Sequence, residues 1–326
     1  MKTAECVTPK HPDKMCDRIS DAILDECLRQ DKNSRVAVEV MGGHGIVTIT
    51  GELTTEAFVD CRAVAQKIVE DKYGVQVNIV QQSPEIARGV DGGGAGDQGI
   101  MIGYATGETK QLIPLEVFLS RDLARFIYQK FSYDGKTQIT IDDKQNIVAV
   151  VVSFQNTKRA ELKKMVDIWL KDKKVRRGVN IHLNPAGDWS VGGFEADTGV
   201  TGRKLAVDNY GPNIPIGGGC FSGKDATKVD RSGAYLARKV AVEILRADAT
   251  IDNVLIQVSY AIGKKYPLEI VADIAFKDGQ RERLDKTEEY RERFVPSNII
   301  RELKLKEPQF EKTAEWGHFG NGFSWE

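Results

Sequence analysis

Apolar residues recur along the chain with two spacings, one typical of helices and one typical of strands. The order helix, hairpin, helix, strand is predicted three times along the chain. In the first unit these elements are expected at 13–29, 35–50, 55–71 and 75–80. In the second unit they are expected at 115–131, 137–154, 157–171 and 179–183.

The third unit lies in the last third of the chain. The pattern there predicts a helix at 229–247, strands near 253–260 and 267–275, and helical segments after 284. Elements in this order form small sheets covered by helices. The sequence therefore predicts an α+β fold of three pseudo-symmetric subdomains, each a small mixed sheet with helices on one face. The approximate subdomain ranges are 1–90, 98–190 and 191–326, with the chain interleaving between them.

Composition narrows the class of protein. A chain of 326 residues is too long for one ordinary core, and 41% hydrophobic with 29% charged residues is typical of globular proteins. The formal net charge of -1 gives no electrostatic reason to expect nucleic acid or a membrane as partner. Five cysteines without a metal-binding spacing fit reduced thiols. With no apolar run of bilayer or signal-peptide length, we expect a cytoplasmic protein.

The segment 217–231 carries the densest chemistry in the chain. It combines four glycines with two lysines, an arginine and two aspartates. Glycines let backbone N–H groups approach a ligand, and Lys224 and Lys228 supply positive charge. Asp225 and Asp230 are candidate metal ligands. Because few ligands require all three residue types, the segment indicates a polyphosphate with bound Mg²⁺.

Two glycine motifs resemble nucleotide-binding sequences only in part. Residues 218–224 match the Walker A pattern, but Asp225 follows where Ser or Thr is required, and the next helix is expected only near 229. This disfavours a P-loop NTPase. Residues 94–99 match GxGxxG, but no strand is expected before them and no helix after them, which excludes a dinucleotide site. Asp97 is the one residue of this loop with a plausible chemical role.

The first helix opens on His11, a proline and Asp13. A histidine at a helix N-terminus is well placed to meet an anion. Acidic residues recur at every fourth position and form one stripe: Asp13, Asp17, Asp21 and Asp25. For His11 and Asp13 a ligand role and a solvated face are both open. For the other three aspartates we expect a solvated face.

Three other segments have ordinary explanations when each is taken alone. Asp134 and Lys136 flank a glycine in a predicted turn. Arg203 and Lys204 follow a glycine and are adjacent cations of a kind common on surfaces. Trp189 follows a turn, so it either belongs to the core or offers its ring face to a base.

Together these residues resemble the S-adenosylmethionine synthetase family. Its motifs match in the family's order at 11–22, 94–106, 202–204, 217–231, 257–263 and 317–320. The family makes S-adenosylmethionine: the sulfur of methionine attacks C5′ of ATP and displaces triphosphate, which is hydrolysed to phosphate and pyrophosphate. The resemblance implies the three-subdomain fold, two Mg²⁺ per site, K⁺, and a homodimer with active sites at the subunit interface.

The resemblance also assigns roles by position. The catalytic positions it implies are His11, Lys136, Arg203, Lys224 and Lys228. Those around ATP further include Asp97, Asp134, Trp189, Ser190, Asp197, Lys204 and Cys220. Those around methionine are Glu52, Gln82, Asp197, Lys228 and Ile262. Asp13 and Asp230 match Mg²⁺ ligands, Glu39 matches the position that organises K⁺, and Glu5 matches a further acidic position near the site.

The chain departs from the family pattern at several positions. It is shorter than typical members, and the loop between Gln82 and Asp97, a mobile lid in the family, is shortened. Pro9 and Lys10 replace an acid and a glycine, and Cys220 replaces an alanine. The alternatives to the family's reaction are a P-loop-like phosphotransferase or NTPase and a catalytically silent nucleotide- or methionine-binding protein.

Overall fold

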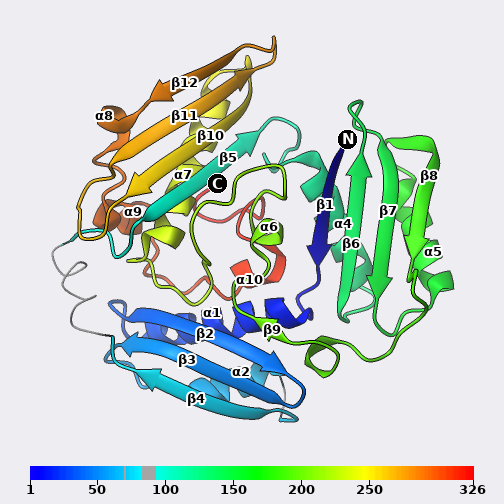
Figure 1. Cartoon of the computed structure of the whole chain (residues 1–326), viewed down its shortest axis with the longest axis horizontal. Helices are drawn as coiled ribbons and strands as arrows, with labels where there is room; N and C mark the ends of the chain where they lie inside the picture. Colours follow the sequence, from blue (N-terminus) through cyan, green and yellow to red (C-terminus); the bar gives the residue numbers. More distant parts are fainter. Residues whose placement is uncertain (70, 83–92) are drawn as a thin grey trace.

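The computed structural model describes residues 1–69, 71–82 and 93–326, and these form three four-stranded sheets (Figure 1). The β2–β3 sheet has the order β4 (Gly74–Val80), β3 (Ile46–Thr54), β2 (Arg35–Gly43), β9 (Gly199–Val200). The β6–β7 sheet has the order β1 (Lys2–Val7), β6 (Gly135–Ile141), β7 (Ile147–Phe154), β8 (Val175–Leu183). The β10–β11 sheet has the order β12 (Arg281–Asp285), β11 (Glu269–Phe276), β10 (Ile251–Tyr260), β5 (Gly99–Thr106).

Each sheet is built on the same plan. A helix precedes an antiparallel hairpin: α1 (Pro12–Gln30) precedes β2, α4 (Leu115–Tyr128) precedes β6, and α7 (Val229–Ala247) precedes β10. The first hairpin strand also pairs antiparallel with a strand from a distant part of the chain, which is β9, β1 or β5 respectively. This repetition confirms the predicted α+β fold of three related units. Each sheet takes strands from separate stretches of the chain.

The sheets differ in their last strand. In the first two sheets, β4 and β8 pair in parallel after crossing over through α2 (Cys61–Val69) and α5 (Arg159–Leu170), so these sheets are mixed. The β10–β11 sheet is antiparallel throughout, unlike the predicted mixed sheet. Its last strand, β12, follows β11 through a tight turn at Gly279, and such a short connection joins only antiparallel neighbours. The charged sequence of β12 gave no apolar period from which to predict it.

Helix α2 begins later than the predicted 55–71. The residues before it are tied to the end of α1, where the Asp31 carboxylate accepts the Thr55 hydroxyl (3.2 Å) and the Glu56 N–H (3.1 Å). The shorter helices complete the described fold: η1 (Gly193–Glu195), α6 (Leu205–Asp208), α8 (Thr287–Tyr290), α9 (Pro296–Glu302) and α10 (Thr313–Trp316). No helix in the described part of the chain is long and apolar enough to cross a membrane.

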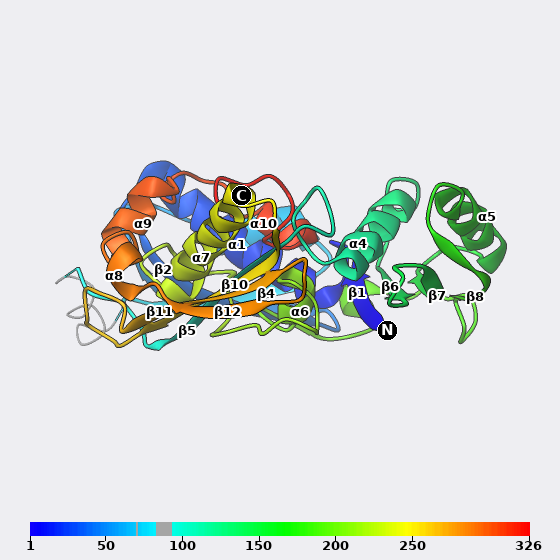
Figure 2. The same cartoon turned by 90° about the horizontal axis from the view of Figure 1, so that it is seen from above.

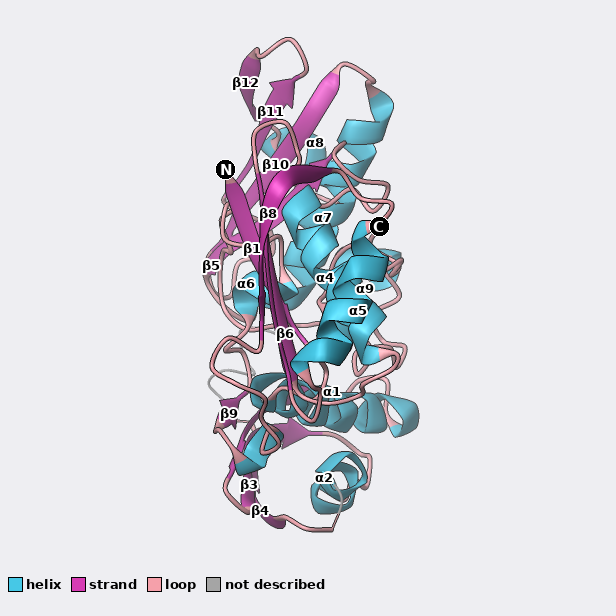
Figure 3. Ribbon diagram, turned by 90° about the vertical axis from the view of Figure 1, so that its right-hand side faces the viewer, coloured by secondary structure: helices cyan, strands magenta, loops and turns pink. Residues whose placement is uncertain are grey.

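The larger helices lie on one side of the molecule and the sheets on the other (Figures 2 and 3). Alternation along β2 produces this layering: Val36, Val38 and Val40 are buried, while Glu39 and Met41 between and after them are exposed. Helices α1 and α7 share one apolar core beneath the β2–β3 and β10–β11 sheets. The β6–β7 sheet has its own core with α4 and α5. Loops between these units carry most of the predicted site residues.

Candidate active site

His11 is the N-cap of α1, and its Nδ1 accepts the N–H of Asp13 at 3.2 Å. The side chain is buried. Burial, together with the positive charges of Lys204 and Lys136, lowers the pKa of His11 to about 3. The ring is therefore neutral near pH 7. Because Nδ1 is the acceptor, the ring proton lies on Nε2, which makes that atom a neutral hydrogen-bond donor.

Asp13 joins the start of α1 to the β9 loop. Its Oδ1 accepts the Val200 N–H at 2.9 Å, and its Oδ2 accepts from the Lys204 ammonium at 2.5 Å. The Arg203 Nε lies 3.7 Å from Oδ1. Two cations and one carboxylate thus meet beside His11.

The start of β6 and the loop before β9 add further predicted residues to this side of the site. Lys136 and Asp197 are exposed, and both are near enough to affect the pKa of His11. Asp134 is buried and accepts the Gly193 N–H at 3.0 Å, and burial raises its pKa. A cavity of about 370 Å³, lined in part by Asp134 and Gly193, opens here.

The loop that follows β8 reaches the edge of this cavity. Trp189 is half-buried, and its carbonyl accepts the Asn156 N–H at 2.8 Å. The Ser190 carbonyl accepts from the Gln155 side chain, which lines the cavity. A side chain at Gly192 would come within 2.9 Å of the Trp189 ring. The backbone of Gly192, which lines the cavity, therefore passes close to the Trp189 ring.

The glycine loop forms a second group of predicted residues. Lys224 Nζ lies 3.2 Å from Asp230 Oδ2, and the Asp230 Oδ1 accepts the Gly219 N–H at 3.1 Å. Burial raises the pKa of the Cys220 thiol well above its usual value. Cys220 packs against Gly202, where an added Cβ would lie 2.7 Å from its sulfur. The glycine loop therefore touches the loop that carries Arg203 and Lys204.

Asp225 is not positioned as a free metal ligand, in contrast to the expectation for this segment. Its Oδ2 accepts the Val36 N–H and the Lys228 ammonium, both at 2.7 Å, and its Oδ1 accepts the Thr227 N–H at 2.8 Å. The aspartate is buried and fastens the glycine loop to β2. Its place in the Walker pattern therefore has a structural explanation.

The acidic stripe of α1 is buried, and the prediction of a solvated face for its three distal members was wrong. Asp17, Asp21 and Asp25 are 1%, 0% and 4% exposed. Each accepts backbone N–H groups from a loop: Asp17 from Gly202 (2.8 Å) and Asp21 from Gly223 (2.9 Å). Asp25 accepts three from residues 309–311, each at 3.0 Å. The stripe pins to α1 the two loops that carry the phosphate-binding candidates.

Neighbouring cations compensate these buried carboxylates. The Asp21 carboxylate forms a two-pronged ion pair with Arg231, at 2.7 and 3.0 Å. Lys14 lies between Asp17 and Asp208 and pairs with both. Burial among these charges raises the pKa of Asp17 to about 6. The four-residue spacing of these aspartates showed that they share one face of the helix. It did not show which part of the chain packs on that face.

The predicted methionine and K⁺ positions lie on or near the β2–β3 sheet. Glu39 and Glu52 lie on neighbouring strands, Glu39 opposite Thr50 and Glu52 opposite Ala37, on the face away from α1. The backbone of Lys224 forms an isolated antiparallel bridge with Ala37, on the edge of β2 opposite β3. Gln82 is buried, and its Oε1 has no hydrogen-bond partner among the described residues.

Two predicted residues lie on loops at one end of the β10–β11 sheet. Asp97 is exposed, and its carboxylate accepts the N–H of Gln98 at 2.7 Å. Ile262 is 55% exposed. Backbone hydrogen bonds between Ala95 and residues 263–264 hold the two loops together. Residues 83–92, most of the loop expected to be a shortened lid, lie outside the described residues.

Most of the predicted residues thus form two groups within one chain. The His11 group consists of His11, Asp13, Asp134, Lys136, Trp189, Ser190, Asp197, Arg203 and Lys204. The Lys224 group consists of Lys224, Lys228, Asp230 and Cys220. The others lie on the β2–β3 sheet or near it (Glu39, Glu52 and Gln82) and on the loops beside the β10–β11 sheet (Asp97 and Ile262). In the described parts of the chain, no hydrogen bond or ion pair joins side chains of the two groups. Nor do three or more His, Cys, Asp or Glu residues there form a metal-binding cluster.

Comparison with known proteins identifies the family. The sequence models of the S-adenosylmethionine synthetase N-terminal, central and C-terminal domains match residues 1–84, 92–189 and 191–326. The chain is similar to S-adenosylmethionine synthases of Mesoplasma florum (40% identical over 363 residues, 99% of this chain and 96% of the relative) and Helicobacter hepaticus (40% over 366, 99% and 94%). Another similar protein is the S-adenosylmethionine synthase of Staphylococcus epidermidis (40% over 373, 98% and 92%). These alignments exceed 326 residues, so the relatives contain residues that this chain lacks. The chain belongs to the S-adenosylmethionine synthetase family.

Proposed function

We propose that this protein synthesises S-adenosylmethionine from ATP and L-methionine and hydrolyses the displaced triphosphate to phosphate and pyrophosphate. One observation carries the proposal. A single buried helix, α1, begins with His11 and Asp13. Further along the same helix, Asp17 and Asp21 bind the loops that carry Lys204 and Lys224. Such an arrangement concentrates positive charge and N–H donors on rigidly held loops, which is what a polyphosphate leaving group requires.

The reaction makes one particular demand on the protein. The sulfur of methionine is nucleophilic without deprotonation, so the protein needs no general base for the attack on C5′. The barrier lies in the negative charge that the triphosphate oxygen acquires as its bond to C5′ breaks. Neutral His11 offers an Nε2–H donor for that oxygen, and Arg203, Lys204 and Lys136 add positive charge around it.

The carboxylates fit the expected Mg²⁺. Asp13 and Asp230 are oxygen donors of the kind that Mg²⁺ prefers, and each is buried against a lysine. When those lysines turn to phosphate oxygens, each carboxylate gains a free oxygen for a metal ion. Two bound Mg²⁺ ions would neutralise charge on the triphosphate, and a K⁺ ion near Glu39 would support the site.

The residues expected near methionine have suitable chemistry. The unpartnered Oε1 of Gln82 is an acceptor for an ammonium group, and Glu52 adds negative charge on the same side of the sheet. Lys228, now paired with Asp225, supplies a cation for a carboxylate. Trp189 offers a ring face on which adenine can stack beside the cavity at Asp134.

We further propose a homodimer with shared active sites. Two observations support it. Among the described residues, no hydrogen bond or ion pair joins side chains of the His11 and Lys224 groups, although their loops touch. All three sheets also turn their faces away from the larger helices toward the same side (Figure 2). Pairing two copies through these faces would bring one group against the other. Light scattering behind size exclusion should give twice the 36.1 kDa chain mass.

Five free thiols are consistent with a cytoplasmic location.

The P-loop alternative is not supported by the geometry. The Asp225 carboxylate is turned toward β2, and α7 begins only at Val229, so no hydroxyl or helix N-terminus follows Lys224 as in a P-loop. A silent binding protein would not need both cation loops pinned to one buried helix. In the described residues we find no structural feature that favours either alternative over S-adenosylmethionine synthesis.

Turnover of three variants tests the proposal. Purified protein with ATP, methionine, Mg²⁺ and K⁺ should form S-adenosylmethionine. Lys136→Met and Asp230→Asn should each lower kcat at least about 100-fold, because the first removes a cation that stabilises the leaving group and the second removes a carboxylate proposed to hold Mg²⁺. Lys171→Met, an exposed lysine after α5, is the control and should keep full activity. Equal rates in all four proteins would refute the assignment.

A further inference from the structure

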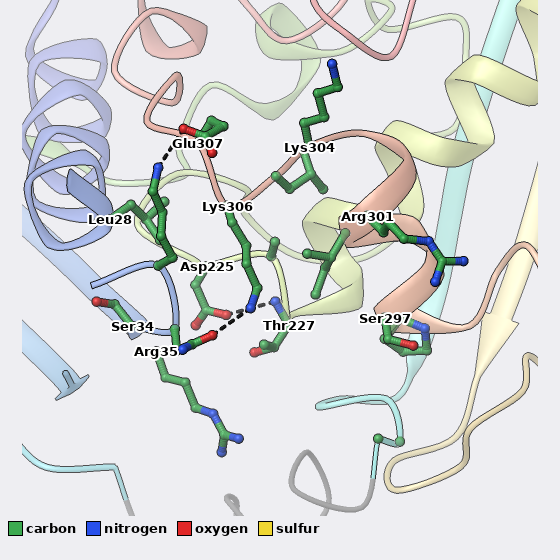
Figure 4. A pocket seen from close by; sticks show the side chains of 18 residues that line it. Leu28, Ser34, Arg35, Asp225, Thr227, Ser297, Arg301, Lys304, Lys306 and Glu307 are labelled. Atoms are coloured by element: carbon green, nitrogen blue, oxygen red, sulfur yellow. Dashed lines mark hydrogen bonds and ion pairs between the residues drawn. The ribbon is translucent and has the colours of Figure 1, made fainter. Parts of the chain in front are cut away.

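A cavity between the end of α1 and α9 lies beside the glycine loop, where the Asp225–Lys228 ion pair borders it (Figure 4). It has a volume of about 760 Å³, within the range of small-molecule sites. Its walls are the end of α1, the start of β2, the end of the glycine loop, α9 and the turn after it. None of the residues assigned above to ATP, methionine or metal lines it.

The cavity has an apolar floor. Leu28, Ala226 and Leu305 lie at its back and are 3%, 7% and 1% exposed, so they belong to the protein interior and offer an occupant little surface of their own. Pro296 and Ile300 of α9 continue the apolar wall. An occupant that buries an apolar ring or chain on this floor gains about 25 cal/mol per Å² of area removed from water.

Positive charge dominates the polar part of the lining. It contains five cations and two acids: Lys32, Arg35, Arg301, Lys304 and Lys306, against Asp225 and Glu307. Both acids are already neutralised. The Asp225 carboxylate pairs with Lys228 at 2.7 Å, and the Glu307 carboxylate pairs with Lys32 at 2.6 Å. Arg301, Lys304 and Lys306 therefore add positive charge to the lining.

Lys306 is the cation best placed for an occupant. Figure 4 shows its side chain extended into the cavity beside Asp225 and Thr227. Its ammonium donates to the Asn33 Oδ1 at 2.6 Å, and in the described residues it has no carboxylate within ion-pair distance. An amide neutralises no charge, so two of its three N–H donors and its full positive charge remain for an anion.

We propose that this cavity binds a small amphipathic anion, a carboxylate, sulfonate or phosphate attached to an apolar ring or chain. Lys306 holds the anionic group, and the apolar part lies against Ile300 of α9, in front of the buried Leu28, Ala226 and Leu305. The proposal goes beyond the reaction described above, because it concerns residues that the reaction does not use. Binding is measured without turnover, so it stands or falls separately from the proposed function.

Fluorescence titration with 8-anilinonaphthalene-1-sulfonate tests the site, since this probe combines a sulfonate with two aromatic rings. Wild-type protein should bind it saturably. Lys306→Glu and Lys306→Met should each weaken binding at least about tenfold. Ser297→Trp, which adds bulk at an exposed position of the lining, should weaken it to a similar extent. The uncharged analogue N-phenyl-1-naphthylamine should bind wild type at least about tenfold more weakly.

The control is Lys171→Glu, which makes the same charge change at an exposed lysine in the β6–β7 subdomain and should bind as wild type does. Thermal melts verify that each variant is folded. Because Ser297 and Lys306 are exposed, we expect their substitution to leave the fold intact. Unchanged affinity in the Lys306 and Ser297 variants would overturn the proposal. Equal loss in the Lys171 control, or equal affinity for the uncharged analogue, would overturn it as well.

Discussion

The Asp21–Arg231 ion pair should be the most sensitive point of the α1 anchor. Both side chains are 0% exposed, and the guanidinium donates to both carboxylate oxygens, at 2.7 and 3.0 Å. Asp21→Asn keeps the size of the side chain and removes its charge. Arg231 then remains buried, with neutral partners such as the Tyr235 hydroxyl at 3.0 Å and no countercharge from residue 21.

The expected cost follows from the burial of that cation. Removing one partner of a buried ion pair costs about 3–5 kcal/mol, because the other charge is left uncompensated. The Asn oxygen accepts the Gly223 N–H as the Asp oxygen does, so the substitution keeps the loop contact at 2.9 Å. We therefore expect Asp21→Asn to lower the free energy of unfolding by about 3–5 kcal/mol.

Urea unfolding monitored by circular dichroism measures this change. Asp172→Asn, an aspartate whose side chain is 76% exposed, is the matched control and should shift stability by less than about 0.5 kcal/mol. Arg231→Met combined with Asp21→Asn should cost less than the sum of the two single changes, because no buried charge then lacks a partner. A loss below about 1 kcal/mol in Asp21→Asn, or strict additivity of the pair, would refute this reasoning.

Three further predictions follow from other parts of the structure. Histidines of the unfolded chain become protonated below about pH 6.5, whereas folded His11 has a pKa of about 3. The contribution of His11 to stability therefore falls as pH falls from about 6.5 to about 3. NMR of its ring should show no titration between pH 5 and 8. Gly103→Ala should destabilise the protein by about 2 kcal/mol or more in thermal melts, because the new Cβ would lie 2.0 Å from the Ala237 carbonyl carbon. In the control Gly107→Ala the nearest atom to the new Cβ is 3.8 Å away, so the loss of stability should be small. Burial raises the pKa of the Cys6 thiol to about 11, so mass spectrometry after iodoacetamide at pH 8 should find it unmodified in native protein and modified in urea.

Much of the fold was predictable because its signals are local. The helix at α7 was predicted with its observed bounds, since apolar residues recur at helical spacing between a glycine-rich loop and a charged end. The hairpins were predicted from alternating residues around turns. Strands β1, β5 and β9 were not predicted, because each is defined by a partner distant in sequence. Sequence periodicity carries no information about such pairing.

The site was predictable to the same extent. Residue type and glycine spacing identified the glycine loop, and the position of His11 at a helix start was visible in the sequence. The burial of Asp17 and Asp21 was not, because the loops that bond to them lie 185 and 202 residues further along the chain. The structural use of Asp225 was hidden for the same reason, since its partner Val36 precedes it by 189 residues. Local pattern shows which residues can do chemistry, and tertiary packing decides which of them are left free to do it.

Product stoichiometry tests the central claim most directly. Protein incubated with ATP, methionine, Mg²⁺ and K⁺ is followed by phosphorus NMR together with chromatography of S-adenosylmethionine. If the triphosphate leaves as a unit and is then cleaved, phosphate, pyrophosphate and S-adenosylmethionine should form in equal amounts, without ADP. Formation of ADP and phosphate without S-adenosylmethionine, from folded protein with all ions present, would contradict the account.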